Sequence, residues 1–149
     1  MADTRATKQL VRRRAERIHT EAVRRVLEEL ADVVPDSDAA RAKYPAGAYP
    51  QRQPKLRTSQ QVTSTSTDTR FSTSVRYTAP QADFTEHGTA PHTIHAKAGG
   101  LLRFYWLKVE AYVAFPKVNH PGSHKHDGWF SRTVAKWPDR LRQARTSTN

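Results

Sequence analysis

Histidine is the residue type in this chain whose spacing most suggests chemistry. Six of the seven histidines fall in two short segments, FTEHGTAPHTIHAK at 84–97 and NHPGSHKHDG at 119–128. The first segment also carries Glu86 directly before His87. Imidazole nitrogens bind zinc, and an imidazole beside a carboxylate can pass protons to and from a substrate. These two segments are therefore the first places to look for a metal centre or an acid–base site.

The spacing of these histidines fits a catalytic site poorly. A zinc site needs three or four ligands that converge at roughly 2.0–2.1 Å, usually with carboxylates behind them. His87, His92 and His95 straddle the turn sequence GTAP, and the helical HExxH pattern is absent. If Glu86 and His87 lie in a strand, they point to opposite faces. No serine–histidine–acid arrangement or close carboxylate pair stands out, so we expect no catalytic residue, no metal ligand, no cofactor and no enzyme.

A structural role accounts for the same residues more simply. Gly88 permits a positive φ where a strand ends, and Pro91 stiffens the chain as it leaves the turn. Glu86 can accept hydrogen bonds from backbone or hydroxyl groups, and His92 can act as a neutral donor and acceptor. The first segment is thus predicted to be a shaped turn. A histidine-ligated metal hydrolase is a competing hypothesis, and it predicts stoichiometric zinc in the purified protein.

The elements that must position these segments begin with an N-terminal helix. Apolar residues recur there at the helical period, and Pro35 ends the pattern. They are Leu10, Ile18, Ala22, Val26, Leu30 and Val33. Glu21 and Arg25 are spaced as an i,i+4 ion pair, and so are Arg25 and Glu29. The basic run at 12–14 is interpreted as a solvated, ion-paired face, with phosphate contact as the alternative.

The middle of the chain predicts an arm followed by strands. Residues 35–57 contain four prolines and little periodicity, which favours an extended arm or long loop. Segment 59–78 predicts two antiparallel strands that meet near 66–69, because Phe71, Thr73, Val75 and Tyr77 alternate with polar residues. The first strand is nearly all polar, so we expect an edge strand or one that another subunit covers.

The C-terminal third predicts more strands and a closing helix. The most hydrophobic segment, 101–118, fits two strands joined near 108–110. Residues 130–144 show the helical period, with Asp127 as its candidate cap, Pro138 as a kink and a frayed tail at 146–149. We therefore predict one α+β domain over 1–149, in which the N-terminal amphipathic helix and the C-terminal helix pack on a small antiparallel sheet.

Net charge suggests partners for this domain. The chain has 25 Lys and Arg against 14 Asp and Glu, a formal charge of +11, and residues 96–149 hold ten basic and three acidic residues. Such a field favours nucleic acid, an acidic protein surface or an anionic membrane. A basic nucleic-acid-binding module is therefore an alternative function. Its candidate phosphate contacts are Lys136, Arg140, Arg142 and Arg145.

Composition also narrows the classes of site. The chain has no cysteine, which excludes disulfides, thiolate zinc sites and cysteine nucleophiles. No apolar run approaches the ~20 residues needed to span a bilayer. The N-terminal sequence MADTRATKQLVRRR has no apolar region after its charges, so we expect no secretory signal and no membrane partner.

The two histidine segments together resemble a family of long-tailed phage neck proteins, the tail-completion or minor tail component proteins. YTAPQADFTEHGTAPHTIHAKAGGLLRF, followed at a distance by VNHPGSHKHDGWFSRTV, is similar to the family pattern of a glutamate before Gly-Thr, then Pro-His, then a His-Pro-Gly turn and a closing helix. The matching positions are Tyr77, Glu86, Gly88, Thr89, Pro91, His92, Leu102, Phe104, His120, Pro121, Gly122 and Phe130. His87 departs from the aromatic residue usual in the family, and QRQPK at 51–55 replaces its Asp-Thr-Gly.

The resemblance implies a structural function. Members of this family have no cofactor and no accepted active site. They sit in the virion neck between head-closure (stopper) and tail-terminator proteins, in a ring of copies of themselves. Apart from Leu102 and Phe104, the matching residues become candidates for structural or interface positions. The portal or adaptor proteins and the DNA in the channel are further expected contacts, and the expected location is the virion neck, with the host cytoplasm during assembly.

Overall fold

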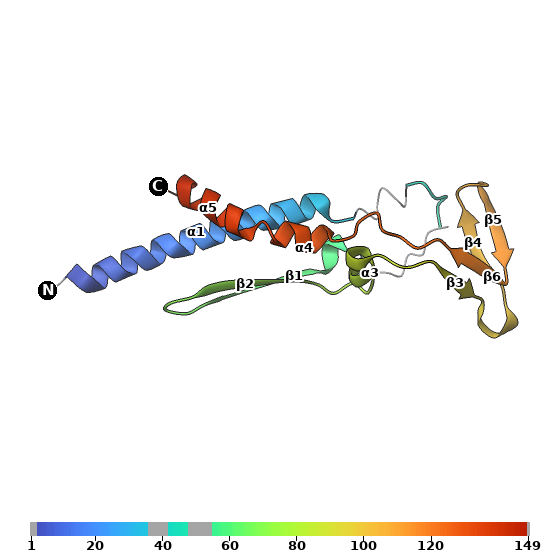
Figure 1. The fold of residues 1–149 in the computed structure, drawn as a ribbon, viewed down its shortest axis with the longest axis horizontal. Coiled ribbons are helices and arrows are strands. Elements are labelled where there is room, and N and C mark those ends of the chain that lie inside the picture. Colours follow the sequence, from blue (N-terminus) through green and yellow to red (C-terminus); the bar gives the residue numbers. More distant parts are fainter. Residues whose placement is uncertain (1–2, 36–41, 48–54, 149) are drawn as a thin grey trace. The chain divides into compact units, whose positions relative to one another are not determined.

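A computed structural model describes residues 3–35, 42–47 and 55–148 (Figure 1). Helices and short antiparallel strands share these residues, which confirms the predicted α+β class. The described residues form two compact units. Unit 1 draws on 1–34, 60–76 and 129–149, and unit 2 on 35–59 and 77–128. The single domain expected over 1–149 stays a prediction.

Helix α1 (Asp3–Val33) is the longest element of unit 1, and only its C-terminal half is buried. Ala22, Val26 and Leu30 are buried as their spacing predicts. Leu10, which the same apolar stripe includes, is instead 67% exposed. Val34 is buried in place of Val33. The reason is that the C-terminal helices pack along the second half of α1, whereas residues 4–17 are exposed.

Ion pairs follow the outer face of α1. The predicted pair between Glu21 and Arg25 forms, with 2.8 Å between Arg25 Nε and Glu21 Oε1. Arg24 also donates to Glu21 at 2.7 Å. These hydrogen bonds, with Arg24 contributing most, lower the pKa of Glu21 to about 2. Arg12 binds Asp68 of the neighbouring hairpin at 2.6 Å, so part of the basic run is ion-paired, as its interpretation required.

The C-terminal helix predicted over 130–144 is two helices, α4 (Trp129–Val134) and α5 (Trp137–Ser147), and α5 lies beside α1 in Figure 1. Pro138 sits in the first turn of α5, where its missing N–H has no helical partner to lose, so it starts a helix rather than kinking one. The tail expected to be frayed continues the helix to Ser147. The hydroxyl of Thr148 donates to the carbonyl of Ala144 at 2.6 Å, and position 149 lies outside the described residues.

Strands β1 (Gln60–Ser66) and β2 (Phe71–Tyr77) form the predicted hairpin, with its turn at 67–70. Hydroxyl groups pair across it: Ser64 with Thr73 at 2.9 Å, and Thr65 with Ser72 at 2.8 Å. All of β1 after its first residue is exposed. The expected polar edge strand is therefore confirmed.

Unit 2 contains helix α3 (Gln81–His87) and strands β3 (His92–His95), β4 (Leu102–Trp106), β5 (Ala111–Phe115) and β6 (Lys117–His120), with single 3-10 turns at Arg57–Ser59 and Lys97–Gly99. The expected strand around Glu86 and His87 is wrong, because both residues lie in the last turn of α3. Gly88 ends a helix rather than a strand, with φ +71°.

The strands within the described residues make three two-stranded antiparallel sheets rather than the one small sheet expected. Within β4–β5 the prediction holds in detail, since the turn lies at 107–110 and Phe104 pairs with Val113. The expected arm at 35–57 falls partly outside the described residues. In its described part, the rings of Tyr44 and Tyr105 meet at 6.4 Å, and Leu56 is buried.

In the described part of the chain no helix is both long and apolar enough to cross a membrane.

Candidate functional site

The two histidine segments are brought together in unit 2 as one antiparallel ladder, in register. Strand β3 pairs with β6 so that His92 lies opposite His120 and His95 opposite Lys117. The ladder is extended on one side by an isolated bridge in which Thr89 and Ser123 exchange backbone hydrogen bonds of 2.8 and 2.9 Å. We call residues 86–95 and 117–128 the paired segments. Residues that the sequence separates by about thirty positions thus form one structure.

Two glycines permit the close approach of the paired segments. Gly122 has φ +83°, and a Cβ atom there would lie only 2.2 Å from the carbonyl oxygen of Thr89. Gly88 has φ +71°, and its Cβ would lie 2.5 Å from both the Ser123 carbonyl oxygen and the Asp127 carboxylate. Both positions therefore require glycine twice over, for the backbone angle and for space. These two requirements explain why glycine stands at position 88 in the first motif and at position 122 in the second.

The paired histidines are held by their own turns. The rings of His92 and His120 lie 5.0 Å apart, tilted by 31°. His92 Nδ1 lies 2.8 Å from the carbonyl oxygen of Ala90, so this nitrogen carries the proton in the neutral ring. His120 Nδ1 instead accepts from the backbone N–H of Gly122 at 3.1 Å. Each ring therefore stabilises the backbone next to it, which is the role predicted for His92.

Two further histidines each pair with a single carboxylate. His87 Nδ1 lies 3.0 Å from Asp83 within α3, and His124 Nδ1 lies 2.8 Å from Asp127. Asp127 thus binds the turn at 124–127, and its other carboxylate oxygen is buried against Gly88. Among the described residues, no three histidine, aspartate or glutamate side chains are grouped closely enough to hold a metal ion.

Backbone contacts close the loop between the paired segments. The N–H of Gly128 donates to the carbonyl oxygen of Glu86 at 2.6 Å. This bond uses the backbone of Glu86, so the acceptor role expected of its carboxylate stays a prediction. Pro91 and Pro121 each stand next to a paired histidine, at the ends of β3 and β6.

The other candidates are placed elsewhere. Tyr77 ends β2, and Phe130 belongs to unit 1, where its ring meets Trp129 at 5.8 Å. Leu102 and Phe104 of the matching pattern lie in β4. The paired segments accordingly unite eight of the ten interface candidates: Glu86, Gly88, Thr89, Pro91, His92, His120, Pro121 and Gly122.

The candidate phosphate contacts separate into two groups. Lys136 and Arg140 both bind Glu29 of α1, with 2.6 Å between Arg140 Nη2 and Glu29 Oε2. These hydrogen bonds, Lys136 first, lower the pKa of Glu29. Arg142 binds Asp139 one turn away on the exposed side of α5. Arg145 lines a groove between α5 and α1.

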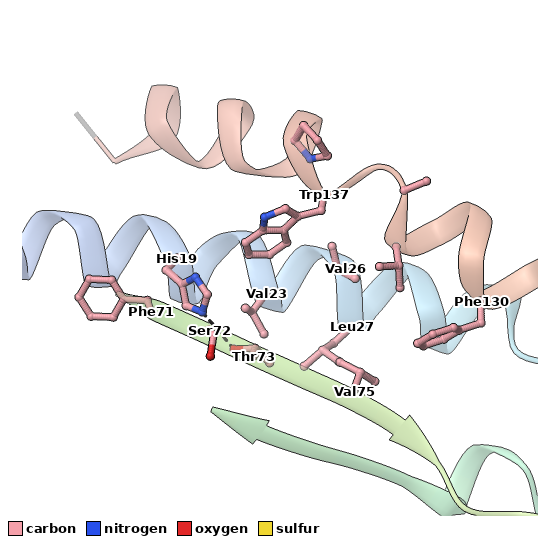
Figure 2. Close-up of a pocket in the computed structure, with 13 residues that line it drawn as sticks. His19, Val23, Val26, Leu27, Phe71, Ser72, Thr73, Val75, Phe130 and Trp137 are labelled. Atoms are coloured by element: carbon pink, nitrogen blue, oxygen red, sulfur yellow. Dashed lines mark hydrogen bonds between the residues drawn. The ribbon is translucent and has the colours of Figure 1, made fainter. Parts of the chain in front are cut away.

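A cavity of about 560 Å³ in unit 1 was not predicted from the sequence (Figure 2). It lies between α1, β2, α4 and α5, and its walls are mostly apolar, with Phe71, Phe130 and Trp137 among them. His19 is its principal polar group. His19 Nε2 lies 3.0 Å from the hydroxyl of Thr73, and burial lowers the pKa of His19.

The chemistry available in this cavity is limited. Its described lining contains one imidazole and no carboxylate, so it suits an apolar group with one polar end rather than acid–base catalysis. The sequence signal for His19 is faint, since one histidine beside an apolar helical stripe looks like any half-exposed residue. The role of His19 can be recognised only in the folded structure, where Phe71 and Thr73 of β2 lie next to it.

Comparisons with protein family models, with curated proteins and with solved structures find no match to this chain. Its function is therefore argued from the residues and their geometry.

Proposed function

We propose that this chain is a structural protein of a long-tailed phage neck, a ring subunit that joins the DNA-filled head to the tail. Its proposed neighbours are further copies of itself and the head-closure and tail-terminator proteins, with the portal or adaptor proteins as additional contacts. The proposal assigns no catalytic residue and no cofactor. It places the protein in the virion neck, after assembly in the host cytoplasm.

The observation that carries the proposal is the exposed apolar surface of the β4–β5 hairpin. On one face of the hairpin Trp106 is 42% and Phe115 37% exposed, and on the other face Tyr112 is 66% exposed. In the turn between the strands, Val109 is also exposed. A lone two-stranded sheet is marginal in water, and exposed apolar clusters mark interaction sites. A subunit whose neighbours cover this hairpin explains why such side chains are left open.

The geometry of the paired segments supports the same proposal. The resemblance to neck proteins rests on two motifs far apart in the sequence, and in the fold these motifs pair residue by residue. The glycines allow the backbones of the two segments to approach closely at positions 88 and 122, and His92 and His120 hydrogen-bond to the backbone beside them. Motifs whose residues set backbone shape rather than supply reactive groups fit an assembly protein.

The direct test is electron microscopy of particles made by a phage that lacks this gene. The proposal predicts filled heads and finished tails that accumulate without joining. Supplying the intact gene from a plasmid should restore joined particles, which controls for effects on neighbouring genes. Normal yields of joined particles without the protein would refute the neck assignment.

A further inference from the structure

Strand β1 has an outer edge to which no other strand of the described residues is paired. It forms a two-stranded sheet with β2 alone. Strand β2 lies against α1 and lines the cavity of unit 1, whereas β1 contributes no residue to that lining and lies on the far side of β2 from α1 (Figure 2). Every residue of β1 after Gln60 is exposed. The edge is therefore open to a further strand.

The hydrogen bonds of the hairpin identify the backbone groups on this edge. At the turn, the N–H of Thr67 donates to the carbonyl oxygen of Arg70 at 2.8 Å. In an antiparallel pair, opposite residues alternate between those that exchange backbone hydrogen bonds and those that do not. The hydroxyl pairs across the hairpin keep the register set at the turn. Counted back from Thr67, the residues whose N–H and C=O groups point away from β2 are Gln60, Val62, Ser64 and Ser66.

Strand β1 lacks the features that usually keep an edge strand from pairing. Such features are charged side chains, prolines and bulges. Residues 58–67 contain no charged side chain, no histidine and no proline, and they are the longest stretch of the chain without a charged residue or histidine. The whole chain carries a formal charge of +11, so two copies repel each other over most surfaces. At β1 a second copy can approach without like charges meeting.

We propose that two copies of this chain pair through β1, antiparallel, around a two-fold axis at Thr63. In this register Gln60 lies opposite Ser66 of the partner subunit, and Val62 lies opposite Ser64 of the partner subunit. All four outward residues of each strand then exchange backbone hydrogen bonds with the other strand. Moving the axis to a neighbouring residue leaves one outward residue of each strand beyond the end of the other. The contact is isologous, so it closes as a dimer.

The side chains of β1 fit the same register. Thr63 meets its own counterpart on the axis, and threonine pairs directly opposite each other stabilise antiparallel strands. On the other face of the strand, Val62 is 43% exposed although its neighbours are polar. The second copy covers part of that valine. Joining the two hairpins gives a sheet of four strands, and sheets of three or more strands are more stable than a lone hairpin.

This inference goes beyond the neck proposal, because it concerns the free chain and uses residues of unit 1 only. The β4–β5 hairpin belongs to unit 2 and is a separate contact surface. If the neck proposal fails, pairing of the purified chain is unaffected. If the purified chain does not pair, the expected accumulation of unjoined heads and tails still holds. The two failures can therefore be told apart.

The first test is analytical ultracentrifugation of the purified full chain over a range of concentrations. The original chain should shift from monomer to dimer as concentration rises. Val62→Pro removes an outward N–H and no hydrogen bond to β2, so it should stay monomeric. Val62→Thr keeps the N–H and the strand preference, so it should still dimerise. A monomeric original chain, a dimer that Val62→Pro leaves intact, or loss of pairing in both variants would overturn the proposal.

The second test reads the register by cross-linking. The chain has no cysteine, so one introduced cysteine reports one contact. Thr63→Cys places two Cα atoms about 4.5 Å apart across the axis, which is within disulfide range. Thr65→Cys is its matched control on the same exposed face, and its two Cα atoms lie about 13 Å apart along the strands. After mild oxidation, non-reducing electrophoresis should show a covalent dimer for Thr63→Cys only. Equal yields from both variants would contradict the pairing.

A charged variant keeps the proposal testable if Val62→Pro does not fold by circular dichroism. Thr63→Lys sets two like charges opposite each other on the axis, so it should weaken dimerisation at least about threefold at low salt. Thr65→Lys adds the same charge, but opposite Gln61 of the partner subunit, so dimerisation should be weakened less. Equal weakening by both lysines would show that only net charge matters and would rule out the two-fold axis at Thr63.

Discussion

Gly122 is the residue on which the paired segments depend most directly. Its φ is +83°, and a Cβ atom there would lie 2.2 Å from the carbonyl oxygen of Thr89. Gly122→Ala therefore adds backbone strain and a backbone overlap, and we expect it to destabilise unit 2 by more than about 2 kcal/mol. Amide hydrogen exchange of residues 89–95 and 117–123, compared between variant and original, measures the loss.

A matched glycine separates strain from overlap. Gly99 has φ +71°, with open space where its Cβ would be. Gly99→Ala should cost only the strain of the backbone angle, roughly 1 kcal/mol. Equal losses at Gly99 and Gly122 would mean that the paired segments do not approach as closely as described.

His19 gives unit 1 a dependence on pH. Burial lowers the pKa of His19 in the folded chain below its usual value of 6.5, so the unfolded chain binds a proton more readily. The contribution is complete above the unfolded pKa and is lost as pH falls through 6.5 toward the folded value. We predict that the free energy of unfolding rises between about pH 5 and pH 8.

The variant that checks this is His19→Gln. Glutamine keeps a polar group opposite Thr73 but does not titrate, so the rise in unfolding free energy over this pH range should shrink. Urea unfolding followed by circular dichroism at both pH values measures it. An unchanged rise would assign the pH dependence to other groups.

At this scale the sequence predicts some residue roles and misses others. The turn role of Gly88 follows from the freedom of glycine to adopt a positive φ, and that of His92 from its position directly after Pro91. The pairing of residues 86–95 with residues 117–128 could not be predicted, because a local motif carries no information about which distant segment pairs with it. His19 was missed for the same reason, since Thr73 and Trp137 approach it only in three dimensions.

Among the elements, the attachment of α5 to α1 depends on Glu29. Its side chain is only 18% exposed and receives hydrogen bonds from Lys136 and Arg140. Glu29→Gln leaves two cations without their charge partner, so we expect a loss of about 1–2 kcal/mol in the stability of unit 1. Because the folded pKa of Glu29 is lowered, this contribution is present above the unfolded pKa and is lost as pH falls through the folded one.

The control lies one position away on the same helix. Glu28 makes an exposed pair with Arg24 within α1, and Glu28→Gln should cost no more than about 0.5 kcal/mol. Thermal unfolding of both variants near neutral pH compares the two losses. Similar values would contradict a specific attachment of α5 through Glu29.

Helices and hairpins were predictable where their signals are local. The helical period of α1, the alternation in β2 and the turn at 107–110 can each be recognised from residues that are close in the sequence. The division into α4 and α5 was not predicted, because the sequence pattern did not show that Pro138 lies in the first turn of a second helix. Strand β6 could not be predicted as a separate element, since its partner β3 lies more than twenty residues earlier.

For the whole molecule, the account requires partners. Both units have small cores, with Leu30 and Trp129 buried in unit 1 and Leu56 and Ala79 in unit 2. Large apolar side chains of unit 2 stay exposed instead. The sequence indicated such a subunit through the nearly all-polar first strand of the segment 59–78, which was expected to be an edge strand or to be covered by another subunit. It could not indicate which hairpin carries the exposed surface, because burial depends on how the elements pack.

The central claim is that neighbours in the neck cover the β4–β5 hairpin. It is tested most directly by counting, in electron micrographs, the filled heads joined to tails in a phage whose only copy of this gene carries Trp106→Thr/Tyr112→Thr. Threonine keeps the strand preference while it removes the exposed rings. The account predicts a large fall in joined particles, whereas Lys108→Thr in the adjacent turn should leave joining normal. Normal joining by the hairpin variant would contradict the account.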